Sequence, residues 1–88
     1  MISEEIVIRN PSGLHARPAS DFILLAKTFQ SQVTLQKKGE GAPVNAKSVM
    51  KVLSLGLVQG DCAVLSVSGP DEEVAFKALS GKLVNSQD

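Results

Sequence analysis

The chain has 88 residues, with nine basic and nine acidic side chains and a formal net charge of zero. This balance predicts no direct binding of nucleic acid or of an anionic membrane, and the absence of Tyr and Trp leaves no platform for stacking bases. A single Cys and a single His exclude an internal disulfide and argue against a zinc site, so we expect no metal and no cofactor.

The length is that of one domain, which we expect to cover residues 1–88. The N-terminal stretch is acidic early and has no long apolar core, so it does not resemble a signal peptide. No apolar run is long enough to cross a bilayer, and no membrane insertion is expected. The expected compartment is the cytoplasm.

The first half of the chain alternates between strand and helix patterns. Residues 5–9 alternate, with Ile6 and Ile8 on one face, and predict a strand that "NPSG" ends. Helical spacing then predicts a helix over 16–29, whose apolar positions are Ala19, Phe22, Ile23, Ala26 and Phe29. Residues 32–37 alternate again, with Val33 and Leu35 inward, and "KKGEGAP" predicts a hairpin-type turn into a short strand near Val44.

The second half repeats the alternation. "AKSVMKVLSLGL" predicts a short helix with Ser48 near its start and Gly56 near its end. "QGD" turns the chain into a strand over 62–68. Gly69 and Pro70 are expected to open a last helix that holds three acids in its first turn, as the helix dipole prefers. The inward residues are expected to be Ala63, Leu65 and Val67 on the strand, and Ala75, Ala78, Leu79 and Leu83 on the helix.

The element order is therefore β-α-β-β-α-β-α. Alternating strands with one apolar face predict an α+β fold, in which helices pack on one side of a mostly antiparallel sheet and the other side faces water.

The stretch "SGLHARPAS" at residues 12–20 holds the only histidine, directly before the predicted first helix. The first backbone amides of a helix lack intrahelical partners and form a natural anion site. Pro18 suits this first turn because its missing N–H is not needed there. Arg17 adds a planar fork of donors for phosphate or carboxylate, although a cation alone is disfavoured at a helix N-terminus.

These features favour a phosphoryl acceptor. The helix terminus disfavours imidazolium, which keeps a ring nitrogen of His15 free as a nucleophile. The amides of Ala16 and Arg17, the guanidinium, and the hydroxyl of Ser12 would then hold the phosphoryl oxygens. The plainer alternative is that His15 is a capping or loop residue and Arg17 is merely solvated, and the residues alone leave both open.

"PSGLHARPAS" resembles the active-site signature of the HPr family, the histidine-containing phosphocarriers of the bacterial phosphoenolpyruvate-dependent sugar phosphotransferase system. "VNAKSVMKVLSLGL" resembles the second signature of that family, and the likeness covers essentially the whole chain. The resemblance implies an open-faced β-sandwich of four antiparallel strands under three helices. It also implies that His15 takes a phosphoryl group on Nδ1 from phospho-enzyme I and passes it to the IIA domain of a sugar transporter. Such a protein is a stoichiometric relay and not a stand-alone enzyme.

Ser48 has two interpretations. By itself it is an N-cap serine, worth about 1 kcal/mol. The resemblance implies a regulatory phosphorylation site instead, served by an HPr kinase/phosphorylase, with a catabolite-control transcription factor as a further partner. A phosphate there would place new negative charge on the surface and repel an acidic donor.

The short helix carries more apolar residues than one face can bury. A core position suits Val52 and is open for Leu53, whereas we expect Val49 and Met50 to be exposed for partner docking. Together with Leu53 and a basic rim of Lys27 and Lys51 they form the expected docking patch, which Leu24 and Leu25 would enlarge or which an oligomer would use. A monomer is the simplest expectation.

Two other functions remain open at this stage. One is a paralogue in a nitrogen-regulatory branch, which shares the same chemistry. The other is an effector module that binds a transcriptional regulator without being phosphorylated, and the intact His15 argues against it.

Overall fold

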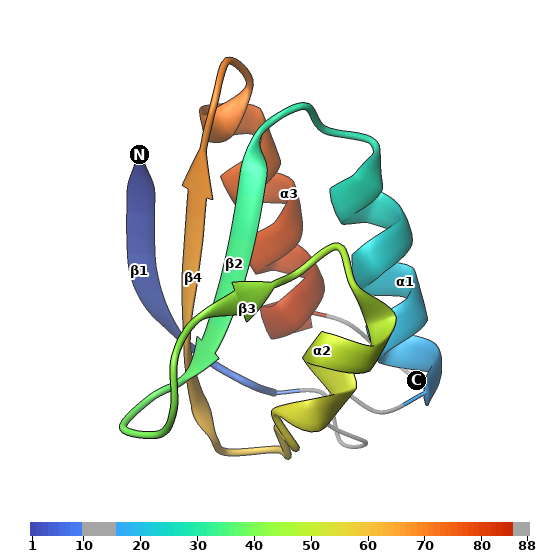
Figure 1. Ribbon diagram of the computed structural model, residues 1–88, viewed down its shortest axis with the longest axis vertical. Coiled ribbons are helices and arrows are strands. Elements are labelled where there is room, and N and C mark those ends of the chain that lie inside the picture. The colour runs from blue at the N-terminus through green and yellow to red at the C-terminus, as the bar shows by residue number, and fades with distance from the viewer. Residues whose placement is uncertain (10–15, 86–88) are drawn as a thin grey trace.

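The computed structural model describes residues 1–9 and 16–85 (Figure 1). Its four strands form one antiparallel sheet in the order β1-β4-β2-β3, and the three helices lie on one side of it. The predicted α+β open-faced sandwich is therefore confirmed. In chain order the elements are β1 (Ile2–Val7), α1 (Ala16–Lys27), β2 (Gln32–Lys37), β3 (Val44–Asn45), α2 (Val49–Ser54), β4 (Cys62–Ser68) and α3 (Glu72–Asn85).

The strands bury one face because their side chains alternate between the two sides of the sheet. Every inward position predicted on β2 and β4 is buried, at Val33, Leu35, Ala63, Leu65 and Val67. Residues between them face the open side, where the hydroxyl groups of Ser3 and Ser66 lie 2.8 Å apart across β1 and β4. The pairing of β4 with both β1 and β2 places it at the centre of the sheet.

The long helices cover the sheet with stripes of small and large apolar residues. On α1 the stripe is buried as predicted, at Ala19, Phe22, Ile23 and Ala26. On α3 the spacing of four holds for Ala75, Leu79 and Leu83, whereas Ala78 is only half-buried. The short helix α2 contributes Val52 alone. Burying each large aliphatic side chain contributes about 1.5–3 kcal/mol, so α2 is the most weakly anchored of the three helices.

Three predicted boundaries were wrong. The first strand spans Ile2–Val7 and not residues 5–9, because main-chain pairing with β4 includes the exposed polar residues near the N-terminus. Ile6 and Ile8 are nevertheless both buried.

The first helix ends at Lys27 and not at Phe29. Thr28 N and Phe29 N bond the carbonyls of Leu25 and Ala26, three residues back, so the chain tightens into a turn. Phe29 still packs against the core from this turn.

The last helix begins at Glu72, and Asp71 precedes it. Asp71 turns its carboxylate away to accept hydrogen bonds from the backbone N–H groups of Gln30 and Ser31, at 2.9 and 3.0 Å. It thereby ties the start of α3 to the segment that leads into β2. No helix in the described residues is long and apolar enough to cross a membrane.

Candidate functional site

The N-terminal end of α1 carries the predicted phosphoryl site. The helix begins at Ala16, as predicted, and its first turn contains no acidic residue. Its leading amides therefore have no carboxylate from their own turn to neutralise them. Ser12 and His15 lie outside the described residues, as do the side chains of Ala16 and Arg17. The structure places the helix start next to the histidine in the chain and leaves the roles of these four residues as predictions.

Ser48 is the N-cap residue of α2, with extended backbone (φ −109°, ψ 117°) and a carbonyl that accepts the N–H of Val52. The predicted N-cap position is confirmed, but the side chain of Ser48 makes no capping hydrogen bond. Asn45 organises the turn instead, because its carbonyl accepts Ser48 N and its Oδ1 accepts Lys47 N at 2.9 Å. The half-buried hydroxyl of Ser48 is thus not committed to the helix.

The predicted docking patch can be compared with the observed exposures. Met50 is 78% exposed, Val49 40% and Leu53 37%, while Val52 is fully buried. Lys27 and Lys51 are exposed as well. The expected exposure of Val49 and Met50 is confirmed, and Leu53, for which a core position was also open, is exposed. Their role in docking stays a prediction.

Leu24 and Leu25 separate on α1. Leu24 is 64% exposed, whereas Leu25 is half-buried and packs against the core. Leu24 lies off the buried stripe, because that stripe follows spacings of three and four from Ala19. Leu24 alone therefore adds apolar surface to the exposed side of α1.

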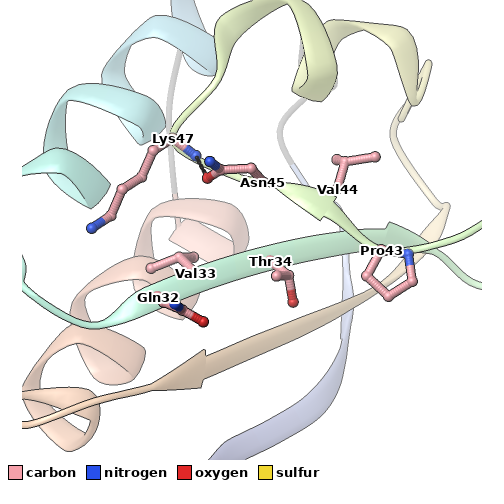
Figure 2. A pocket seen from close by; sticks show the side chains of 7 residues that line it. All are labelled: Gln32, Val33, Thr34, Pro43, Val44, Asn45 and Lys47. Atoms are coloured by element: carbon pink, nitrogen blue, oxygen red, sulfur yellow. Dashed lines mark hydrogen bonds between the residues drawn. The ribbon is translucent and has the colours of Figure 1, made fainter.

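Sequence reasoning assigned no role to Lys47, although it lies within the second signature, directly before Ser48. Its Nζ donates a hydrogen bond of 2.9 Å to the carbonyl of Phe29, just beyond the end of α1. Figure 2 shows this side chain extending away from Thr34. Lys47 also lines a cavity of about 290 Å³. No sequence signal could have revealed this contact, because the two residues meet only through the tertiary fold. The cavity is lined by Gln32, Val33, Thr34, Pro43, Val44, Asn45 and Lys47.

Two carboxyl groups with a lowered pKa, those of Asp71 and Glu72, lie at the start of α3. A hydrogen bond from the Ser31 hydroxyl, with others from the Gln30 and Ser31 amides, lowers the pKa of Asp71. The N-terminal ammonium of Met1 and the N–H of Gly69 lower the pKa of Glu72. Within residues 1–9 and 16–85, no group of three or more His, Cys, Asp or Glu side chains is arranged to hold a metal.

The comparison with protein families matches residues 2–85 to the family described as "PTS HPr component phosphorylation site". The phosphocarrier protein HPr of Buchnera aphidicola subsp. Acyrthosiphon pisum is 42% identical over 80 residues, which cover 91% of this chain and 92% of that protein. The fold and the match together define the class: a phosphocarrier of the phosphotransferase system, and not a stand-alone enzyme.

Solved structures agree with this class. The crystal structure of HPr-C-His from Thermoanaerobacter tengcongensis superposes with a TM-score of 0.87 at 46% identity, covering 94% of this chain and 91% of that one. The chain belongs to the HPr family. The resemblance predicted from the two signatures is thereby confirmed.

A longer relative shares the same region. The multiphosphoryl transfer protein of Salmonella typhimurium is 40% identical over 80 residues, which cover 90% of this chain but only 21% of that protein. The chain thus corresponds to about a fifth of the multiphosphoryl transfer protein.

Proposed function

We propose that His15 is the phosphoryl acceptor, loaded by phospho-enzyme I and unloaded by the IIA domain of a sugar transporter. One observation carries the proposal: the family matched over residues 2–85 is described by its phosphorylation site, and the only histidine directly precedes α1. In the first transfer the Nδ1–P bond forms as the bond from phosphorus to the donor breaks. In the second transfer the Nδ1–P bond breaks as phosphorus forms a bond to the acceptor in the IIA domain. Water takes no part in either transfer.

The start of α1 would stabilise the transferred group. The amides of Ala16 and Arg17, the Arg17 guanidinium and the Ser12 hydroxyl are the proposed donors to its oxygens. The absence of an acid from the first turn supports this role, because a carboxylate there would repel the phosphoryl group. Preorganised donors of this kind act most strongly on the charge that develops during transfer.

The test is an intact-mass measurement after incubation with phosphoenolpyruvate and enzyme I from the same organism. We expect the mass of one added phosphoryl group, lost in mild acid as phosphohistidine is, and no addition to a His15→Ala variant. A phosphoryl group that persists in His15→Ala, or no addition to the wild-type chain, would contradict the proposal. Circular dichroism of the variant checks that it is folded.

The proposed docking patch for enzyme I and IIA consists of Val49, Met50 and Leu53, rimmed by Lys27 and Lys51. Exposed apolar side chains beside cations fit partners that present an apolar contact with acidic surroundings. Lys51→Glu is expected to raise the KM of enzyme I for the carrier, whereas Lys82→Glu on α3 serves as the charge-matched control. The proposed setting is a cytoplasmic monomer, and sedimentation at increasing concentration tests the oligomeric state.

Ser48 is proposed as a second, regulatory phosphorylation site, used by an HPr kinase/phosphorylase and read by a catabolite-control transcription factor. The support is its half-buried hydroxyl, which makes no capping bond and stands next to the exposed Val49 and Met50. A phosphate there would add negative charge within the docking patch. Ser48→Asp is expected to weaken binding of enzyme I relative to Ser48→Asn in calorimetry, and equal affinities would refute the charge argument.

A further inference from the structure

The turn between β3 and α2 is fastened to the end of α1 by one side chain. Lys47 is half-buried, and its ammonium donates to the carbonyl of Phe29 at 2.9 Å. Its own N–H donates to Asn45 Oδ1, so the residue is held from both backbone and side chain. Carbonyl groups at the end of a helix lack intrahelical donors and carry partial negative charge, which makes a lysine ammonium a favourable partner.

The helix that follows has few other anchors. α2 is six residues long, buries only Val52, and lacks a side-chain cap at Ser48. An isolated helix of this length is not stable in water, so its position depends on tertiary contacts. Ala46, which is fully buried, fixes the β3 side of the turn by donating its N–H to the Val33 carbonyl at 2.9 Å. Lys47 supplies the link on the α1 side, through its hydrogen bond to the carbonyl of Phe29.

We infer that Lys47 is a positioning residue that holds the first turn of α2 at a fixed place beside α1 through its hydrogen bond to Phe29. This inference rests on the proposed docking patch, which draws residues from both helices. The patch can meet a partner as one surface only if α2 keeps its place relative to α1. Lys47 itself need not touch the partner.

The expected consequence is a change in partner binding without a change in chemistry. Loss of the bond lets the start of α2 move, so the partner must order it on docking and the affinity falls. The proposed phosphoryl site lies at the start of α1, whereas Lys47 contacts the chain just beyond the end of α1. The rate of phosphoryl transfer within the bound complex should therefore not change. A positioning role therefore raises the KM of enzyme I for the carrier and leaves kcat intact.

The experiment compares Lys47→Met, which keeps the length of the side chain but not its donor, with Lys47→Arg, which keeps a donor. Lys38→Met is the matched control, because it removes a 2.9 Å bond from lysine to Glu5 on β1, a bond that involves neither α1 nor α2. Phosphoryl transfer from phospho-enzyme I gives KM and kcat for each. We expect Lys47→Met to raise KM about three- to tenfold with kcat unchanged. Lys47→Arg should recover most of the loss, and Lys38→Met should behave as wild type.

A second readout does not depend on phosphoryl transfer. Amide hydrogen exchange of Val52, whose N–H bonds the Ser48 carbonyl, should accelerate in Lys47→Met, while the amides of β4 stay protected. An unchanged KM together with unchanged exchange overturns the inference, as does an equal rise in KM for Lys38→Met. If the wild-type chain accepts no phosphoryl group, the proposed function fails, and exchange at Val52 alone then decides whether Lys47 positions α2.

Discussion

The N-terminal ends of α1 and α3 differ in the charge of the side chains in their first turns. Both present leading amides and the positive end of a helix dipole. α3 has Glu72 and Glu73 in its first turn, and Glu72 reaches back to accept the N–H of Gly69 at 3.1 Å. α1 has no acid in its first turn and carries Arg17 there instead.

The difference separates a structural helix end, at α3, from the proposed phosphoryl site at α1. Glu72 and Glu73 place negative charge at the start of α3, so an external anion would be repelled there. α1 forgoes a stabilisation of about 0.3–1 kcal/mol that an acid in its first turn would provide. The start of α1 is the proposed place of the phosphoryl group that the HPr family carries.

The largest expected effect comes from giving α1 the charge pattern of α3. Arg17→Glu should slow phosphoryl transfer from phospho-enzyme I by about 100-fold or more, because it replaces a donor with a repelling carboxylate. The same change should leave the free energy of unfolding equal or higher by about 0.3–1 kcal/mol. Lys77→Glu on the exposed side of α3 makes the same change of charge and should transfer normally. Equal transfer rates for the two variants would show that the charge at the start of α1 does not matter for phosphoryl transfer.

The next effect is on stability alone. A Cβ at Gly69 would lie 2.6 Å from Ser31 Cα, so Gly69→Ala should lower the free energy of unfolding by about 1–3 kcal/mol. Gly81 lies within α3, where an added Cβ meets open space, so Gly81→Ala should raise the free energy of unfolding by about 0.5–1 kcal/mol. Urea unfolding measures both. If both folded variants accept the phosphoryl group at the wild-type rate, the start of α3 takes no part in phosphoryl transfer. A slower rate would show that the start of α3 affects the phosphoryl site.

A smaller effect should depend on pH. Hydrogen bonds from Ser31 and Gln30 hold the pKa of Asp71 below its ordinary value of 3.8, and the Met1 ammonium holds that of Glu72 below 4.5. A carboxyl whose pKa is lower in the folded state stabilises the fold above its ordinary pKa and loses this contribution as the pH falls through the folded value. Asp71→Asn should therefore melt below wild type at pH 7, and the gap should narrow below about pH 4. A gap that does not vary with pH would show that the carboxylate charge is not responsible.

The smallest effect extends the comparison from helix ends to helix faces. Met50 on α2 and Val74 on α3 are both highly exposed apolar residues, at 78% and 66%. Met50→Ala should raise the KM of enzyme I for the carrier about threefold to fivefold, as expected for a lost apolar contact. Val74→Ala should leave it unchanged. If both variants behave alike, the docking patch does not include α2.

Local chemistry along the chain was enough to predict most elements. Period-two alternation marked β2 and β4, and spacings of three and four marked the buried stripes of α1 and α3. Errors occurred at the ends of elements, where competition for hydrogen bonds decides. Asp71 was predicted as a first-turn acid but accepts hydrogen bonds from Gln30 and Ser31, and α1 ends at Lys27, two residues before the apolar pattern stops.

The candidate site divides in the same way. The sequence by itself determined the fold class, the start of α1 after His15 and the surplus of apolar residues on α2, because these follow from periodicity and from the chemistry of neighbouring residues. Only the tertiary structure decided that Leu24 is exposed while Leu25 packs inward, that Ser48 makes no side-chain cap, and that Lys47 reaches Phe29. These features depend on how separate elements pack against each other in three dimensions, and no local pattern in the sequence encodes that packing.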